Sequence, residues 1–260
     1  MSLYTQTSGH GPELLLVHGW SLHGGIWEQL LPLLEPHFRV TRVDLPGHGR
    51  SDWQGEETLD AVVEAVLSVA PKAAIWLGWS LGGLIATRAA VLAPARVSAL
   101  VEVASSPCFV RKPDWQSAML PALLDTFAAE LAEDYVRTLN RFLALQVRGS
   151  ENSSETLKTL RALMLVHGEP NAGALRAGLE LLRTTDLRDS LAAVECPVLL
   201  LAGERDTLVP LHALQASREL FCDAQLQVIA GAGHAPFIGQ PEQVARMITG
   251  FLCEDIAQGC

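Results

Sequence analysis

The sequence lacks long apolar runs and an excess of positive charge. Its longest aliphatic runs, such as Leu14–Val17 and Val198–Ala202, are far too short to span a bilayer. Its amino terminus shows no basic segment followed by a long apolar stretch, so we expect no signal peptide. The 260 residues carry a formal net charge of -10 at pH 7, which argues against nucleic acid as a partner. We therefore expect a monomer that binds neither membranes nor nucleic acid.

Cysteines are too few and too scattered for a disulfide framework. There are five of them, an odd number, and no two form a C-x-x-C pair. An unpatterned set of this kind is typical of reduced thiols, and so predicts a cytoplasmic protein. The five are Cys108, Cys196, Cys222, Cys253 and Cys260.

Motifs for metal ions and nucleotide cofactors are missing as well. The histidines lack H-x-x-x-H spacing with a nearby carboxylate, which argues against zinc-dependent hydrolysis. No G-x-G-x-x-G opens a helix after the first predicted strand, and no Walker loop is present. We therefore expect neither a metal nor a cofactor.

What the chain does contain is an alternation of short aliphatic runs and longer helical patterns. This alternation predicts an α/β fold with a mostly parallel sheet and helices on both faces. Apolar residues make up 49% of the chain, which suffices for one large core. The predicted strands are Tyr4–Thr7, Leu14–Val17, Val40–Val43, Ala73–Leu77, Ala99–Val103, Val198–Ala202 and Gln225–Ile229. The predicted helices between them include Ile26–Leu34, Leu59–Val69, Leu81–Leu92, Leu211–Leu220 and Pro241–Leu252.

The alternation stops between Phe109 and Arg183, where helical patterns follow one another without strands. An all-helical insertion of this kind predicts a cap over the carboxyl ends of the strands, where open α/β sheets bind ligands. We expect a core of residues 1–108 and 184–260, with a helical cap of residues 109–183 inserted into it. The predicted cap helices are Leu120–Leu131, Asp134–Val147, Ser154–Val166 and Ala172–Leu182.

A serine stands in the turn between a predicted buried strand and a predicted helix. The sequence Gly78-Trp79-Ser80-Leu81-Gly82 fits the G-x-S-x-G nucleophile elbow, whose glycines leave room for a strained turn. Backbone N–H groups at the start of the following helix favour developing negative charge. The pattern is short and arises by chance in many chains. Its position between strand and helix nevertheless predicts Ser80 as a nucleophile.

An acid and a histidine follow Ser80 in the order that such a nucleophile requires. A serine needs a base and the base an orienting acid, and one widespread chain order is Ser, Asp or Glu, His. Asp206 lies in the loop after the sixth predicted strand, and His234 lies in the loop after the seventh. Both loops leave the sheet on the side of the elbow, which predicts a triad. The alternatives are that Asp206 caps the helix after Pro210, that Glu204 is the acid, or that His234 is an ordinary loop histidine.

Two backbone N–H groups are the predicted oxyanion site. The first predicted apolar strand ends in His18-Gly19-Trp20, and an H-G-x loop there commonly supplies one donor, here the N–H of Trp20. The second is the N–H of Leu81, the residue after the nucleophile. One such donor typically contributes about 3 kcal/mol to lowering the barrier. We expect His18 to brace its loop rather than to act as a base.

Motifs along essentially the whole chain resemble the α/β-hydrolase superfamily. They are His18–Trp20, Asp44–Ser51, Gly78–Gly83 and Gly233–Phe237. Three longer segments resemble, more specifically, the family of pimeloyl-(acyl-carrier protein) methyl ester esterases of biotin synthesis. These segments are Ala74–Leu84, Val103–Phe109 and Arg141–Gln146.

The resemblance implies a reaction and a substrate. A carboxylic ester hydrolase of this family hydrolyses the methyl ester of a pimeloyl chain carried by acyl carrier protein, and releases methanol and the free carboxylate. Ser80 would attack the ester, with His234 as the base and Asp206 holding its tautomer. The substrate contacts implied besides Ser80 and His234 are Trp20, Leu81, Phe142, Leu143, Ala144, Leu145 and Gln146.

Acyl carrier proteins are strongly acidic, and this chain is acidic too, so docking requires a local basic patch. Arg137, Arg141 and Arg148 fall within roughly 40° of one another on a helical projection, which predicts a basic stripe on one cap helix. The alternative is an ordinary solvated face. The start of the next helix offers only Lys158 where the family carries further arginines, so docking is weaker there or uses Arg161.

Other functions with the same fold stay open. The triad also suits a general short-chain carboxylesterase or a hydrolase of C–C bonds. A non-catalytic, ligand-binding member of the fold is a third possibility, because fold does not determine function, but an intact triad argues against it. The serine at position 80 argues against haloalkane dehalogenation, because that chemistry needs an aspartate there.

Overall fold

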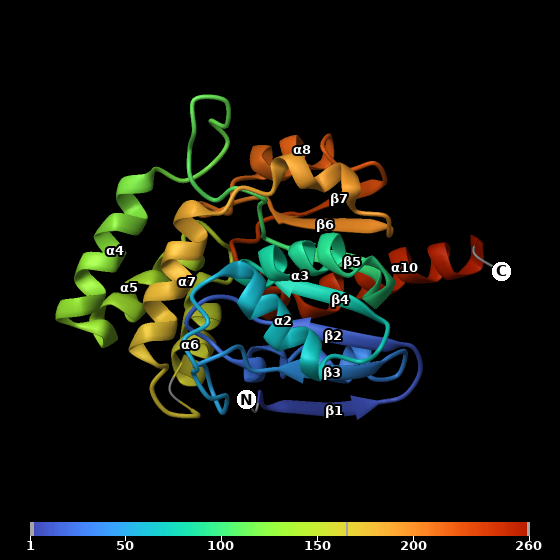
Figure 1. The fold of residues 1–260 in the computed structure, drawn as a ribbon, viewed down its shortest axis with the longest axis horizontal. Helices are drawn as coiled ribbons and strands as arrows, with labels where there is room; N and C mark the ends of the chain where they lie inside the picture. Colours follow the sequence, from blue (N-terminus) through green and yellow to red (C-terminus); the bar gives the residue numbers. More distant parts are fainter. Residues whose placement is uncertain (1–2, 165, 259–260) are drawn as a thin grey trace.

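A computed structural model describes residues 3–164 and 166–258, and confirms the predicted α/β fold. Its strands form one seven-stranded sheet in the order β1-β3-β2-β4-β5-β6-β7 (Figure 1). β1 runs antiparallel to β3, and the other pairings are parallel. The chain ends of the predicted core, Met1, Ser2, Gly259 and Cys260, lie outside the described residues. The strands are β1 (Thr5–Gly9), β2 (Glu13–Val17), β3 (Arg39–Val43), β4 (Ala74–Trp79), β5 (Val97–Val103), β6 (Val198–Gly203) and β7 (Ala224–Ile229).

The central strands β4 and β6 lie where the sequence predicts them, with ends shifted by at most two residues. Every residue of β4 and β6 is buried, because helices cover both faces of the sheet, and such strands read as continuous apolar runs. The edge strand β1 is different, since its sequence is polar and none of its residues is fully buried. Its extent follows its pairing, from Thr5 opposite Val43 to Gly9 opposite Arg39, and not the predicted range Tyr4–Thr7.

Helices pack on both faces of the sheet. In Figure 1, α2 and α3 lie in front of the strands and α10 lies behind them. The predicted single helix Ile26–Leu34 is wrong, because the chain forms a short 3-10 helix and then a separate α-helix. Pro32 lies in the first turn of that α-helix, and because it has no backbone N–H it cannot donate the hydrogen bond that would join this helix to the preceding 3-10 helix. The elements outside the cap are η1 (Gly24–Trp27), α1 (Leu31–Leu34), α2 (Leu59–Val69), α3 (Leu81–Leu92), η2 (Pro94–Arg96), η3 (Arg188–Ala193), α8 (Leu211–Arg218), α9 (Pro236–Gly239) and α10 (Pro241–Gln258).

Four consecutive helices gather at one end of the sheet and form the predicted helical insertion (Figure 1). Asp134 caps α5 by accepting from the N–H of Arg137, and Asn171 caps α7 in the same way through Gly173. The division into a core and a cap domain at residues 109 and 183 stays a prediction. The helices are α4 (Pro121–Glu133), α5 (Tyr135–Gln146), α6 (Ser153–Met164) and α7 (Ala172–Thr184).

Hydrogen bonds between loops at the strand ends and the cap helices hold the two together. The Trp20 indole N–H donates to the carbonyl of Leu175 at 2.8 Å. His23 accepts from Gly25 at Nδ1, so its proton lies on Nε2, which donates to the carbonyl of Leu163 at 2.8 Å. The cap is therefore fastened directly over the carboxyl ends of the strands. Among the described helices, none combines the length and apolar character that crossing a membrane requires.

Candidate active site

Ser80 occupies a strained turn between β4 and α3. Its φ of 54° and ψ of -118° lie where residues other than glycine are rarely found. A side chain on Gly78 would overlap the backbone of Gly82, and one on Gly82 would overlap the carbonyl of Val17. Both glycines of the elbow are therefore required by close backbone approach. The Ser80 N–H donates to the carbonyl of Val103 on the neighbouring strand at 3.0 Å, which anchors the turn to the sheet.

The structure brings the three predicted triad residues into one hydrogen-bonded chain. Ser80 Oγ lies 2.9 Å from His234 Nε2, and His234 Nδ1 lies 2.7 Å from Asp206 Oδ2. A carboxylate only accepts, so the imidazole proton lies on Nδ1, and Nε2 is free to accept from the serine. All three residues are buried, since Ser80 is 5%, Asp206 6% and His234 1% exposed. This geometry suits proton transfer from Ser80 to His234.

The alternative roles of the acids do not match the observed contacts. Asp206 Oδ1 accepts from the N–H groups of Leu208 and Val209, at 2.8 and 2.9 Å, so that this carboxylate is fixed by its own loop. Glu204 instead accepts from the N–H of Gly231 at 2.8 Å and braces the loop that leads to the histidine. Asp206, not Glu204, is therefore the acid placed against the imidazole.

The two predicted oxyanion donors lie on either side of the elbow. Leu81 is the first residue of α3, where helical N–H groups have no intrahelical partner. Among the described residues, no hydrogen bond uses the backbone N–H of Trp20 or of Leu81. A Cβ on Gly178 of α7 would lie 2.6 Å from the Trp20 ring, so only glycine lets the cap approach this closely. Both donors are thus available, and their role stays a prediction.

The residues of α5 that are predicted to contact substrate, 142–146, do not all face the interior of the protein. The buried side chains are Phe142, Leu143 and Gln146, the half-buried one is Leu145 and the exposed one is Ala144. The Phe142 ring meets the Trp20 ring edge-on, with their centroids 4.8 Å apart. The Gln146 carbonyl accepts from the backbone N–H of His234 at 2.8 Å. The cap therefore contacts both the oxyanion loop and the histidine loop.

His18 braces the floor of the site, as the sequence predicts. Its Nε2 accepts from the N–H of Leu45 at 2.9 Å, so Nδ1 carries the proton and donates to the carbonyl of Gly19. Burial, assisted by the nearby His48, lowers the pKa of His18 to about 3. A neutral imidazole fixed at both nitrogens holds its loop and has no free position for proton transfer.

The predicted basic stripe is only partly present. α5 ends at Gln146, so Arg148 lies beyond the helix, and the prediction that it shares one helical stripe with Arg137 and Arg141 is wrong. The cause is local, since a turn follows the last helical residue. Arg141 forms an ion pair with Glu130 of α4, which partly neutralises it.

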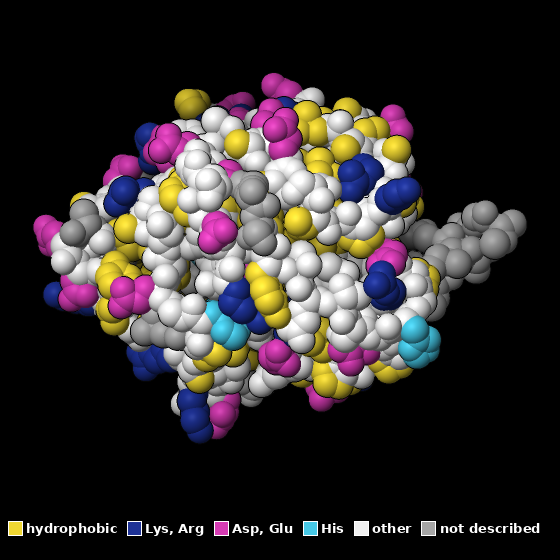
Figure 2. Space-filling view, turned by 60° about the horizontal axis from the view of Figure 1, so that its bottom comes forward, with side chains coloured by type: hydrophobic (Ala, Val, Ile, Leu, Met, Phe, Trp, Pro, Cys, Tyr) yellow, Lys and Arg dark blue, Asp and Glu magenta, His cyan; other side chains and the backbone are white. Residues whose placement is uncertain are grey.

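The other basic side chains considered for docking are exposed and do not share this ion pair. They are Arg137 on α5, Arg148 after its end, and Lys158 and Arg161 on α6. On the face shown in Figure 2, acidic and basic side chains are interspersed. A basic docking surface on that face would therefore be small and depend on a few side chains.

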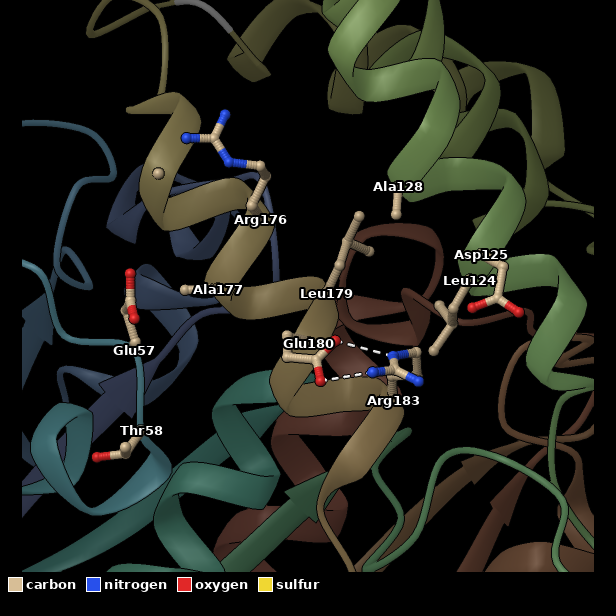
Figure 3. Close-up of a pocket in the computed structure, with 11 residues that line it drawn as sticks. Glu57, Thr58, Leu124, Asp125, Ala128, Arg176, Ala177, Leu179, Glu180 and Arg183 are labelled. Atoms are coloured by element: carbon tan, nitrogen blue, oxygen red, sulfur yellow. Dashed lines mark hydrogen bonds and ion pairs between the residues drawn. The ribbon is translucent and has the colours of Figure 1, made fainter.

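A groove of about 560 Å³ lies between α4 and α7, beside the start of α2 (Figure 3). Its floor is largely apolar, and the ion pair between Glu180 and Arg183 crosses one end of it. No triad residue lines this groove. Ala177 lines both the groove and a cavity of about 20 Å³ that Leu81 also lines. The helix α7 thus lies between the groove and Leu81.

Within the described residues, no group of three or more His, Cys, Asp or Glu side chains could hold a metal ion.

A buried carboxyl group lies under the elbow. Glu102 of β5 is opposite Gly78 in the strand register and 2% exposed, and it bonds to the hydroxyl of Thr87. Thr87 Oγ1 also lies 2.9 Å from the carbonyl of Gly83, in the first turn of α3. Burial raises the pKa of Glu102 from 4.5 to about 7, because the hydroxyl is too weak a partner to offset desolvation.

Glu102→Gln is expected to remove a pH dependence of stability. The folded-state pKa exceeds the unfolded one, so the contribution of Glu102 is complete below about pH 4.5 and is lost as pH rises through 7. The free energy of unfolding of the wild type should fall relative to the variant by about 3 kcal/mol across this window. Urea unfolding of both proteins at pH 4.5 and pH 8 measures the difference. A difference that does not change with pH would show that Glu102 is ionised in the folded protein throughout.

The sheet order, the elbow and the hydrogen-bonded Ser80, His234 and Asp206 together define a protein of the α/β-hydrolase class. Residues 12–241 match the model of the alpha/beta hydrolase fold family, and the chain belongs to this family. An esterase from Exiguobacterium antarcticum has the same fold, with a TM-score of 0.87 and 21% identity, covering 96% of this chain and 94% of that one.

Within that class the chain belongs to the pimeloyl-(acyl-carrier protein) methyl ester esterase family. A relative of that name from Photobacterium profundum is 43% identical over 251 residues, covering 96% of this chain and 98% of the relative. A second, from Xanthomonas campestris pv. campestris, is 45% identical over 251 residues with the same coverage. The family resemblance stated from sequence motifs is thereby confirmed.

Proposed function

We propose that this protein hydrolyses the methyl ester of a pimeloyl chain carried by acyl carrier protein, in biotin synthesis. The proposal is carried by the hydrogen-bonded chain from Ser80 through His234 to Asp206, in a full-length member of this esterase family. The products are methanol and the free carboxylate, which stays attached to the carrier through its other end. We further propose that the protein acts as a cytoplasmic monomer. The free thiols of Cys108, Cys196 and Cys222 support that location.

The geometry supports a two-step reaction. Ser80 Oγ attacks the ester carbonyl while His234 Nε2 accepts its proton, and Asp206 holds the imidazole in the required tautomer. The N–H groups of Trp20 and Leu81 stabilise the oxyanion that forms. The intermediate collapses, and His234 returns the proton to the leaving methoxide, which departs as methanol. His234 then activates water, which attacks the acyl-enzyme and releases the carboxylate.

The experiment that tests the substrate compares two esters. Purified protein is assayed with methyl pimeloyl-acyl carrier protein and with p-nitrophenyl acetate, and rescue of a biotin-requiring strain that lacks the esterase is scored in parallel. The proposal expects a much higher kcat/KM for the carrier-bound ester, and rescue. Equal efficiency on both esters, without rescue of the strain, would contradict the proposed substrate and indicate a general esterase.

Charge reversal on α5 is expected to weaken recognition of the carrier alone. Acyl carrier proteins are acidic, and Arg137 and Arg141 lie exposed on α5. The double variant Arg137→Glu/Arg141→Glu should lower kcat/KM for the carrier-bound ester by about tenfold at low salt, because opposite charges accelerate association. The effect should shrink as salt is added.

The matched control for this variant is Arg176→Glu, which reverses an exposed charge of the cap on α7, at the groove of Figure 3. It should leave kcat/KM for the carrier-bound ester within about twofold, since surface charges distant from a contact contribute little. Neither variant should change hydrolysis of p-nitrophenyl acetate. An equal loss in both variants would mean that the whole cap surface, and not α5, steers the carrier.

A further inference from the structure

The buried tryptophans of this protein differ in what their indole N–H groups do. Trp27, Trp76 and Trp79 are each 0% exposed. The Nε1 atoms of Trp27 and Trp76 have no hydrogen-bond partner in the described part of the chain. Trp79 is different, because its N–H donates to the backbone carbonyl of His234 at 2.7 Å. The residue next to the nucleophile is thus bonded directly to the residue that carries the base.

The backbone N–H and the backbone carbonyl of His234 are both hydrogen-bonded, each to a different part of the protein. Trp79, in the elbow, binds the carbonyl, and the carbonyl of Gln146 at the end of α5 accepts the N–H. The Trp79 ring is closely packed by its neighbours. Phe237 contacts it edge-on at 5.3 Å between centroids, and a Cβ on Gly19 would lie 2.9 Å from its six-membered ring. An indole that is confined in this way is a rigid support for the histidine backbone.

We propose that Trp79 is a positioning residue for the general base. Because Trp79 and Ser80 are consecutive residues of one strained turn, the bond from Trp79 places His234 relative to the same backbone that carries the serine. It keeps Nε2 within 2.9 Å of Ser80 Oγ. Small misplacements of reacting groups cost large factors in rate, so a rigid link between nucleophile and base has a direct catalytic consequence. The inference rests on the proposed roles of Ser80 and His234, and not on the carrier-bound substrate.

Trp79→Phe removes the donor and keeps an aromatic ring in the core. With p-nitrophenyl acetate we expect kcat to fall by about tenfold or more, while KM stays within about twofold, because the link acts on the base and not on substrate binding. The rate at which a fluorophosphonate labels Ser80 should fall by the same factor, since labelling also needs an activated serine. Trp76→Phe is the matched control, because it removes an equally buried indole whose N–H has no partner. It should leave both rates within about twofold.

A second substitution keeps the test decisive if Trp79→Phe unfolds the protein. Incorporation of 3-benzothienylalanine at position 79 preserves the bicyclic shape and replaces the N–H by sulfur. The same fall in kcat and in labelling rate supports the positioning role, and circular dichroism verifies the fold. The control carries the same replacement at Trp76, and rates within twofold of that control overturn the positioning role. If the wild type hydrolyses p-nitrophenyl acetate but not the carrier-bound ester, the proposed substrate fails while this test still stands.

Discussion

Ser80→Ala is expected to lower kcat by about a millionfold, for the carrier-bound ester and for p-nitrophenyl acetate alike. The hydroxyl of Ser80 is the only atom of the elbow that can form the acyl-enzyme, and without it His234 has no nucleophile to activate. A residual rate about a thousandfold above the uncatalysed one should survive, because the proposed oxyanion donors of Trp20 and Leu81 remain. Steady-state assays at high enzyme concentration, together with loss of fluorophosphonate labelling, measure both quantities.

A buried serine elsewhere provides the control for Ser80→Ala. Ser217 is buried in α8, where its hydroxyl donates to the carbonyl of Ala213 at 2.8 Å. Ser217→Ala should keep kcat within about twofold, since the lost hydrogen bond affects stability by only about 1 kcal/mol. Retention of more than a tenth of the activity by Ser80→Ala would mean that another residue is the nucleophile.

The predictions that agree with the structure rest on signals that are local in the sequence. β4 and β6 were predictable because burial on both faces of a sheet requires an unbroken apolar run. The meeting of Ser80, Asp206 and His234 was predictable because parallel strands place the loops that follow them at one edge of the sheet. In each case a few consecutive residues, and the order of the strands, carry the information.

Two features that the sequence did not predict depend on contacts between distant residues, and a third is local. The range of β1 follows its pairing with β3. Arg148 leaves its predicted stripe for a local reason, because α5 ends two residues earlier, at Gln146. The bond from Trp79 to His234 joins positions 155 residues apart, and no short pattern announces it. The first variable position of a G-x-S-x-G motif looks free in sequence, and only the packing around the elbow shows what Trp79 contacts there.

Asp206→Asn is expected to lower kcat by about ten thousandfold near neutral pH, with little change in the fold. Asp206 uses one oxygen for the N–H groups of Leu208 and Val209, and the other for His234 Nδ1. An asparagine that keeps the first two bonds must turn its NH2 group toward Nδ1. Nδ1 then has to accept, and the imidazole proton moves to Nε2, the atom that faces Ser80. The base is thereby blocked, although all side chains keep their places.

The opposite amide orientation is no better, because the NH2 group would then face the two N–H donors of the loop. Glu204→Gln is the matched control, since Glu204 lies two residues away and its amide oxygen can still accept from the N–H of Gly231. It should retain kcat within a few-fold of the wild type. The reverse pattern, with Asp206→Asn active and Glu204→Gln inactive, would assign the orienting acid to Glu204. The two isosteric variants therefore decide between the two carboxylates by kinetics alone.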